Sequence, residues 1–305
     1  MTAWAQGRRL SVAVVGLGGV GGGAAGSLAA AGRHDITACT RQSIARFTLE
    51  RAEGTVEAPL RLLAEPAQAK PVDWVLVCTK THQTAATGPW LARLCTPATR
   101  VAVLQNGIDH IVRVSPLVGG ATIVPVLVYY NGERLAPDRV RIRHAGSFDA
   151  VVADDDPGRA FVDLFEGTPL RIIRSGDFAT LAWRKLLINA VANPITALTL
   201  QRQAVLRRSD IQDLCRGILD EAVAAARAEG VKLAEDETAR TIATLENFSG
   251  ELGTSMYFDR LAGHRVEVEA LTGAIVAAGD RHGMAMPLNR ALLTLLRAIN
   301  DAISA

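Results

Sequence analysis

The first half of the chain alternates short apolar runs with stretches that favour helix. Residues 11–15 (SVAVV) are an apolar run of strand length, and the small residues that follow are typical of a closely packed helix. Predicted strands cover residues 11–15, 35–40, 72–79 and 101–105, and predicted helices cover residues 19–31 and 82–93. Because strands that alternate with helices through short turns pair in parallel, this half is predicted to be a parallel sheet with helices on both faces.

The apolar pattern changes twice further along the chain. Between about residues 120 and 175 it becomes strand-rich, in the segments ATIVPVLVYY, RVRIRH, DAVVAD and PLRII, with one helix near 157–166. After residue 176 the apolar positions follow a helical period, and Gly230, Gly283 and Pro287 act as stop signals. The predicted helical segments are 177–201, 209–229, 235–248, 255–282 and 287–303. We therefore expect two domains, residues 1–175 and residues 176–305.

A glycine-rich turn follows the first strand. Gly16, Gly18 and Gly21 have the G-x-G-x-x-G spacing, which permits a tight turn, close approach of a pyrophosphate and close packing of the next helix. The helix N-terminus adds unpaired N–H groups that attract phosphate. The predicted cofactor-binding residues of this turn are Gly16, Leu17, Gly18, Gly19, Val20 and Gly21. The fold class is therefore α/β, a Rossmann-type dinucleotide-binding domain followed by an all-helical domain, with a ligand-free βα turn as the alternative.

Composition limits the other classes of function. The chain has 305 residues, 49% of them hydrophobic, and a formal net charge of +2, which does not favour nucleic acid or an anionic membrane as partner. We expect no transmembrane helix and no secretory signal. The four scattered cysteines and six histidines show no disulfide or metal-ligand spacing, so we expect a cytoplasmic protein that needs no metal.

The second predicted strand ends on a cation rather than a carboxylate. Arg41 follows it, whereas Asp35 stands at the opposite end of the strand. A carboxylate at the end of this strand would favour NAD, but an arginine there suits the 2′-phosphate of NADP. Lys80, after the next strand, adds a second cation at the same edge of the sheet. NADP is therefore the predicted cofactor, unless both side chains are ordinary surface cations.

A polar stripe crosses an otherwise apolar helical segment, LAWRKLLINAVANPITALTL. Lys185, Asn189 and Asn193 stand four residues apart and so share one helix face. Asparagine is a poor helix former, and two in register among apolar residues indicate a function. The stripe is interpreted as the wall of a substrate cleft. The alternative is a solvated face, with Asn193 beside Pro194 as the end of the helix.

These motifs together resemble the ketopantoate reductase family over almost the whole chain. The likeness rests on GLGGVG at 16–21, CTK at 78–80, LQNGID at 104–109, WRKLLINAVANPITAL at 183–198, TSMYFDRLAGHRVEVEALTGAIV at 254–276 and GMAMP at 283–287. The resemblance implies reduction of a 2-oxo acid to the 2-hydroxy acid, foremost ketopantoate to pantoate, with hydride from NADPH. It also implies that the helical domain serves in substrate binding and in formation of a homodimer.

The resemblance assigns roles to individual residues. It implies that Lys185 is the catalytic proton donor and that Asn189, Asn193 and Ser255 bind the substrate. It implies that Asn106 contacts both cofactor and substrate. On the cofactor side, Glu267 is expected near the nicotinamide ribose or beside Lys185, and Arg41 and Lys80 match the NADP-phosphate cations.

Two positions depart from the family pattern on the substrate side. Leu252 and Gln203 stand where many members carry asparagine, which puts ketopantoate itself in doubt but leaves the reaction type intact. One alternative is therefore a relative that reduces another carbonyl or an imine in a specialised pathway. A non-catalytic NADP-binding sensor and an enzyme resembling 6-phosphogluconate or 3-hydroxyacid dehydrogenases are others. The intact polar stripe disfavours the sensor, and the QNG and NP motifs disfavour the dehydrogenase.

Overall fold

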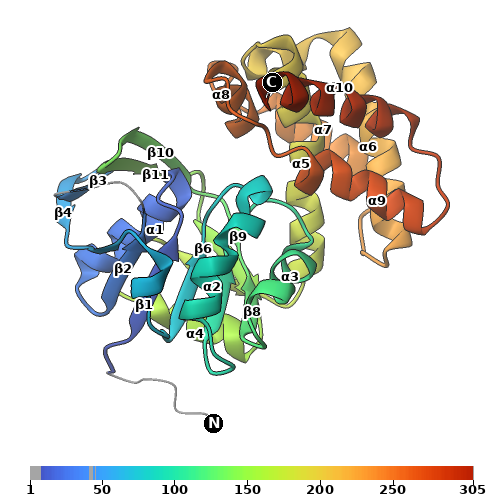
Figure 1. The fold of residues 1–305 in the computed structure, drawn as a ribbon. Helices are drawn as coiled ribbons and strands as arrows, with labels where there is room; N and C mark the ends of the chain where they lie inside the picture. Colours follow the sequence, from blue (N-terminus) through green and yellow to red (C-terminus); the bar gives the residue numbers. More distant parts are fainter. Residues whose placement is uncertain (1–7, 41–43, 45, 305) are drawn as a thin grey trace. The chain divides into compact units, whose positions relative to one another are not determined.

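The computed structural model describes residues 8–40, 44 and 46–304, and it divides into two compact units. The first comprises the described residues up to Asn106 together with His110–Phe178. The second comprises Gly107–Asp109 and the segment from Ala179 onward. The first is an α/β unit and the second is helical, as the sequence predicts (Figure 1).

A six-stranded parallel sheet forms the centre of the first unit, in the order β5-β2-β1-β6-β7-β8. Its strands are β1 (Ser11–Val15), β2 (Asp35–Cys39), β5 (Arg61–Leu63), β6 (Trp74–Val77), β7 (Arg100–Val103) and β8 (Thr122–Pro125). The alternation of side chains explains why residues 12–15 of β1 are all apolar. Val12 and Val14 lie in one core cluster, and Ala13 and Val15 lie in another, so both faces of the strand are buried.

Helices cover both faces of this sheet. The cluster around Val12 includes residues of α1 (Gly19–Ala31) and α4 (Asp156–Leu164), and the cluster around Ala13 includes residues of α2 (Gly88–Leu94) and α3 (His110–Val114). The predicted helical stretch near 82–93 is helical but is not one continuous helix. Two 3₁₀ turns, Thr81–Gln83 and Ala85–Thr87, precede the short α2, and the Thr84 and Thr87 hydroxyls donate to backbone carbonyls in this stretch. Such local side-chain bonds compete with regular helix.

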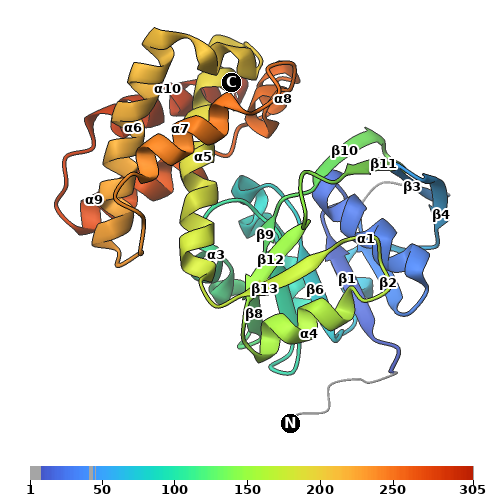
Figure 2. The same ribbon diagram turned by 180° about the vertical axis from the view of Figure 1, so that it is seen from behind.

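Two smaller sheets complete the first unit (Figure 2). One has the order β10-β11-β3-β4 and joins segments that lie more than 70 residues apart; its strands are β3 (Phe47–Arg51), β4 (Gly54–Ala58), β10 (Asn131–Ala136) and β11 (Arg139–Arg143). The other has the order β13-β12-β9; its strands are β9 (Leu127–Val128), β12 (Ala150–Ala153) and β13 (Ile172–Ser175). The sequence pattern predicted β11, β12 and β13 but not β3, β4 or β10. β4 and β10 carry exposed polar residues, and β3 buries only Phe47 and Leu49 between polar residues.

The second unit is a bundle of helices around one apolar core. Its helices are α5 (Phe178–Thr199), α6 (Ser209–Ala228), α7 (Glu237–Glu246), α8 (Ser255–Leu261), α9 (Ala274–Arg281) and α10 (Pro287–Ser304). Leu187 and Val191 of α5 and Ile218 and Leu219 of α6 are fully or almost fully buried in this core. The amphipathic periodicity of α6 and α7 is therefore explained by burial of one stripe of each helix, whereas α5 is buried on all sides over residues 190–197.

The predicted continuous helix over 255–282 is wrong, because the chain breaks after α8. Gly263 has φ +67°, and the His264 N–H donates to the Asp259 carbonyl at 2.8 Å, which is the pattern of a glycine-terminated helix. The chain then runs extended to Val266, which Asn300 of α10 holds by bonds to its N–H and its carbonyl. A short π-helix, Glu269–Gly273, leads into α9.

Candidate active site

The glycine turn between β1 and α1 has the backbone geometry that its spacing predicts. Gly16 has φ +101°, and a Cβ there would lie 2.8 Å from the Thr79 nitrogen. A Cβ on Gly21 would lie 1.8 Å from the Gly16 carbonyl oxygen, so helix and turn touch backbone to backbone. At Gly18, the N-cap of α1, a Cβ would have no described atom within 4 Å. The turn thus leaves open space at the helix N-terminus, which fits a pyrophosphate.

The remaining glycines of α1 serve packing against the β10-β11-β3-β4 sheet. A Cβ on Gly19 would lie 1.9 Å from the Gly132 oxygen of β10, and one on Gly22 would lie 2.5 Å from Val140 of β11. The Tyr130 hydroxyl donates to the Val20 carbonyl at 2.6 Å. Of the predicted cofactor residues, Gly19 and Val20 are therefore held by this sheet, a contact that the sequence pattern did not reveal.

The charged residues near β2 and β6 are placed as follows. Asp35 begins β2 and pairs with Arg9 at 2.6 Å, so it lies at the edge of the sheet away from the glycine turn. Lys80 follows β6 and precedes the turn Thr81–Gln83, beside Thr79, which contacts Gly16. Arg41 lies outside the described residues. NADP preference is therefore still a prediction from the sequence.

The LQNGID segment is bonded at several points. The buried Gln105 side chain donates to the Thr79 carbonyl at 2.9 Å and to the Thr84 hydroxyl at 2.9 Å. The backbone carbonyl oxygen of Gln105 lies 2.8 Å from Nε2 of the buried His110. Arg113 donates to the Asn106 carbonyl at 3.1 Å. Asn106 is thus held through its backbone, next to a loop that also contacts the glycine turn.

The polar stripe lies on α5, and the helix does not end at Asn193. α5 continues through Pro194 to Thr199, so the interpretation of Asn193 as a helix end is wrong. Lys185 and Asn189 are partly buried, and Asn193 is buried. A solvated face is thereby contradicted for Asn193. The Thr196 hydroxyl, one turn further, donates to the Ala192 carbonyl at 2.7 Å, in the region where Pro194 lacks an N–H.

Lys185 is the titratable group of this stripe. Burial lowers the pKa of its ammonium from 10.5 to about 8, and the negative charge of Glu267 acts in the opposite direction. Glu267 is itself buried, in the extended segment that precedes the π-helix. The predicted pair of Lys185 and Glu267 is therefore brought together inside the helical unit. An ammonium with a pKa near neutrality is suited to donate a proton.

Ser255 begins α8 and is exposed, next to a contact that joins α8 to α5. Thr254 caps α8 by accepting a bond from the Tyr257 N–H at 3.1 Å. The Thr254 and Thr196 hydroxyls lie 2.7 Å apart. Because Thr196 follows Asn193 by less than one turn, this bond fixes the start of α8 beside the polar stripe. No local sequence pattern predicts this bond, since the two threonines are far apart in the chain.

The two positions that depart from the family pattern lie together. The Gln203 N–H donates to the Leu252 carbonyl at 3.0 Å, so both residues belong to one patch of the helical unit. Leu252 is 53% exposed. Two asparagine positions of the family pattern have therefore changed at adjoining places.

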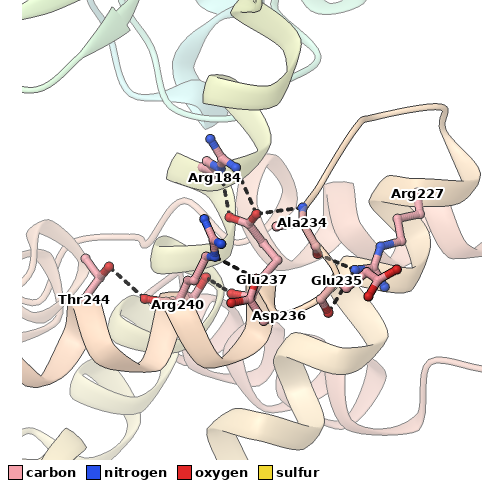
Figure 3. Close-up of polar contacts among 9 residues, drawn as sticks. Arg184, Arg227, Ala234, Glu235, Asp236, Glu237, Arg240 and Thr244 are labelled. Atoms are coloured by element: carbon pink, nitrogen blue, oxygen red, sulfur yellow. Dashed lines mark hydrogen bonds and ion pairs between the residues drawn. The ribbon is translucent and has the colours of Figure 1, made fainter.

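The sequence pattern also did not predict an ion pair made by Arg184, the residue before Lys185. Arg184 donates from Nε and Nη2 to the two oxygens of Glu237, at 2.8 and 3.0 Å (Figure 3). Glu237 is only 3% exposed, and it also accepts a bond from the Ala234 N–H at 3.2 Å. The pair ties α5 to the start of α7. The sequence around Arg184 does not reveal this pair, because Glu237 lies far away in the chain.

Within the part of the chain that the structure describes, no group of three or more His, Cys, Asp or Glu side chains is arranged to hold a metal ion. Nor is any described helix both long and apolar enough to cross a membrane.

Comparison with known proteins follows the same division of the chain. The model of the family described as "Ketopantoate reductase PanE/ApbA" matches residues 12–155, and that of "Ketopantoate reductase PanE/ApbA C terminal" matches residues 177–300. A 2-dehydropantoate 2-reductase of Caulobacter vibrioides is 37% identical, over 94% of this chain and 98% of its own length. Another, from Mycobacterium tuberculosis, is 35% identical over 95% of this chain and 98% of its own length.

Solved structures agree with these sequence matches. A PanE/ApbA family ketopantoate reductase from Ralstonia eutropha JMP134 has a TM-score of 0.87 at 28% identity, covering 97% of this chain and 100% of that one. A dimeric ketopantoate reductase from Staphylococcus aureus has a TM-score of 0.84 at 25% identity, covering 96% of this chain and 100% of that one. The resemblance seen in the motifs is confirmed: the chain belongs to the ketopantoate reductase family and is an oxidoreductase of the 2-dehydropantoate 2-reductase type.

Proposed function

We propose that the protein reduces ketopantoate to pantoate with NADPH, and that Lys185 supplies the proton. The observation that carries this proposal is the ammonium of Lys185, whose pKa burial lowers to about 8 on a helix that also bears Asn189 and Asn193. The relatives named 2-dehydropantoate 2-reductase support the substrate. In this assignment residues 1–175 bind NADP, and residues 176–305 bind the substrate and form a dimer, as in the dimeric Staphylococcus aureus neighbour.

Different residues of the helical unit have separate roles in the proposed reaction. When bound, NADPH would supply the hydride for reduction at C2 of the 2-oxo acid. Lys185 stabilises the alkoxide that develops on the substrate oxygen and donates its proton to it. Glu267 favours the charged form of Lys185. Asn189 and Asn193 orient the polar end of the substrate, and Ser255, at the N-terminus of α8, binds its carboxylate.

The first unit would hold the cofactor at the glycine turn. The open space at Gly18 receives the pyrophosphate, and Arg41 and Lys80 bind the 2′-phosphate. Asn106 contacts cofactor and substrate. The reaction, together with cysteines that are all free in the described part of the chain, favours the cytoplasm.

A second candidate is the reduction of a more apolar 2-oxo acid by the same machinery. Leu252 favours it, because an exposed leucine replaces an amide that would bond a substrate hydroxyl. A site without that partner discriminates less against a substrate that lacks the hydroxyl.

The experiment is NADPH oxidation with ketopantoate, with its deoxy analogue 3,3-dimethyl-2-oxobutanoate, and with a panel of other 2-oxo acids and imines. We expect turnover of ketopantoate, with a kcat/KM for the deoxy analogue within a factor of about 10⁴ of it. A larger preference for ketopantoate would show that Leu252 does not affect recognition. Tight NADPH binding without turnover of any compound would support a sensor and reject the proposal.

A further inference from the structure

The chain passes from the first unit to the helical unit at one residue of the proposed site. Asn106 belongs to the first unit, and Gly107–Asp109, which follow it directly, belong to the helical unit. His110 returns the chain to the first unit. Three residues from the first half of the sequence are therefore built into the structure of the second half. We call Gly107–Asp109 the tether.

Gly107 lies close to the backbone of the π-helix. Its φ is +99°, and a Cβ on it would lie 2.7 Å from the carbonyl oxygen and 3.2 Å from the Cβ of Ala270. Ala270 is buried within the π-helix, three residues after Glu267. The Ala270 carbonyl oxygen belongs to the backbone of the π-helix, so it cannot shift to make room for a Cβ without distorting that helix. Only glycine satisfies both the conformation and the space.

The segments on either side of Asn106 are held independently. Ile108 packs against the apolar core of the helical unit. Before Asn106, the Gln105 amide is bonded to Thr79 and Thr84 of the first unit. In the sequence, Asn106 thus follows a residue bonded within the first unit and precedes a residue seated within the helical unit.

We propose that Gly107 is a positioning residue, which sets the place of Asn106 by seating the backbone on the carbonyl of Ala270 in the turn that follows Glu267. The inference rests on the proposed function for the role of Asn106. Gly107 affects cofactor binding and catalysis through Asn106, and not through the stability of the helical unit. Replacement of Gly107 by any larger residue moves Asn106 away from the cofactor and substrate.

The test is a double-mutant cycle of Gly107→Ala and Asn106→Ala. We expect Gly107→Ala alone to raise the NADPH Kd and lower kcat/KM for ketopantoate, each by about tenfold or more. In the Asn106→Ala background, the same change should alter either quantity by less than about twofold, because the side chain to be positioned is already gone. Equal losses in both backgrounds would show a purely structural role and overturn the inference, as would near wild-type values for Gly107→Ala.

Gly120→Ala is the matched control. Gly120 has φ +86°, and a Cβ there would meet no described atom within 4 Å. Alanine at position 120 therefore has the same unfavourable positive φ but no steric clash. The NADPH Kd and kcat/KM of Gly120→Ala should be those of the wild type. Ile108→Ala loosens the tether without a clash, so it should act in the direction of Gly107→Ala even if that variant does not fold. Wild-type behaviour of Ile108→Ala would contradict the inference.

The NADPH Kd, measured by the fluorescence of the bound nucleotide, separates this inference from the proposed function. If the wild type bound NADPH but did not reduce ketopantoate, the substrate would be wrong. The binding cycle would still decide whether Gly107 acts through Asn106.

Discussion

At Lys185, two opposing electrostatic effects act on one ammonium. Burial removes water from the charge and lowers its pKa, and the carboxylate of Glu267 partly restores it. The result, a pKa of about 8 in place of 10.5, keeps the group mostly protonated at neutral pH and makes proton release easier. A solvated lysine with its ordinary pKa of 10.5 would also be protonated at neutral pH, but it would release its proton less readily.

Lys185→Ala should lower kcat by about 10²–10⁴, the usual effect of removing a positioned general acid. NADPH binding should change by no more than a few-fold, because the residue acts on the substrate oxygen. Steady-state kinetics and NADPH titration check both values. Lys185→Arg should not restore activity, since a guanidinium keeps its proton at neutral pH.

The pH profile gives an independent test of the same residue. Because the charged form is the acid, kcat of the wild type should fall as the pH rises through about 8. Glu267→Gln removes the charge that supports the ammonium, so it should move this alkaline limb to lower pH. A Lys185→Ala variant with near wild-type turnover would show that the stripe is structural.

At the scale of the element, α5 is a long helix held at several points. Its apolar side joins the core of the helical unit, Thr196 bonds to the cap of α8, and Arg184 pairs with Glu237 (Figure 3). Burial raises the pKa of Glu237, but the bonds from Arg184 and Ala234 outweigh it, so the pKa lies below its ordinary value. The carboxylate is therefore ionised and stabilising at neutral pH.

Glu237→Gln should lower the free energy of unfolding by about 1–3 kcal/mol, the range for hydrogen bonds to charged groups. The native pKa is depressed, so the contribution is present above the ordinary glutamate pKa and lost as the pH falls through the native value. Chemical denaturation of both proteins across this acidic range should therefore show their stabilities converging at low pH.

Asp236→Asn is the control for this prediction. Asp236 is adjacent and bonds to Arg240 at 2.7 Å, but both side chains are exposed to solvent. Its loss should leave the stability nearly unchanged. An equal loss in the two variants would indicate that burial of Glu237 has no special effect.

At the scale of the whole molecule, cofactor choice depends on the end of β2, where the sequence has Arg41 in place of a carboxylate. Arg41→Ala should weaken NADPH binding by about 1.5–3 kcal/mol and leave NADH binding nearly unchanged, because only NADPH carries the 2′-phosphate. Titration with both nucleotides checks it. A wild-type preference for NADH, or equal weakening of both, would reject the assignment.

Features with local signals could be predicted from the sequence alone. The apolar residues 12–15 of β1 indicate a strand buried on both faces, and the helical period of α6 and α10 indicates burial of one helix face; the structure confirms both. Lys185, Asn189 and Asn193 share a face simply because helix geometry repeats. Together with the motifs, these patterns sufficed to identify the fold and the family.

The contacts between distant segments depend on the tertiary structure. β10 is largely polar and β3 alternates buried Phe47 and Leu49 with polar residues; both pair with β11, and α1 packs its glycines against the resulting sheet. The break after α8 depends on Gly263 and on Asn300 holding Val266. The seating of Gly107 on Ala270 has no counterpart in any local pattern. Periodicity reports that a residue is buried, but which partner buries it depends on the packing of the whole chain.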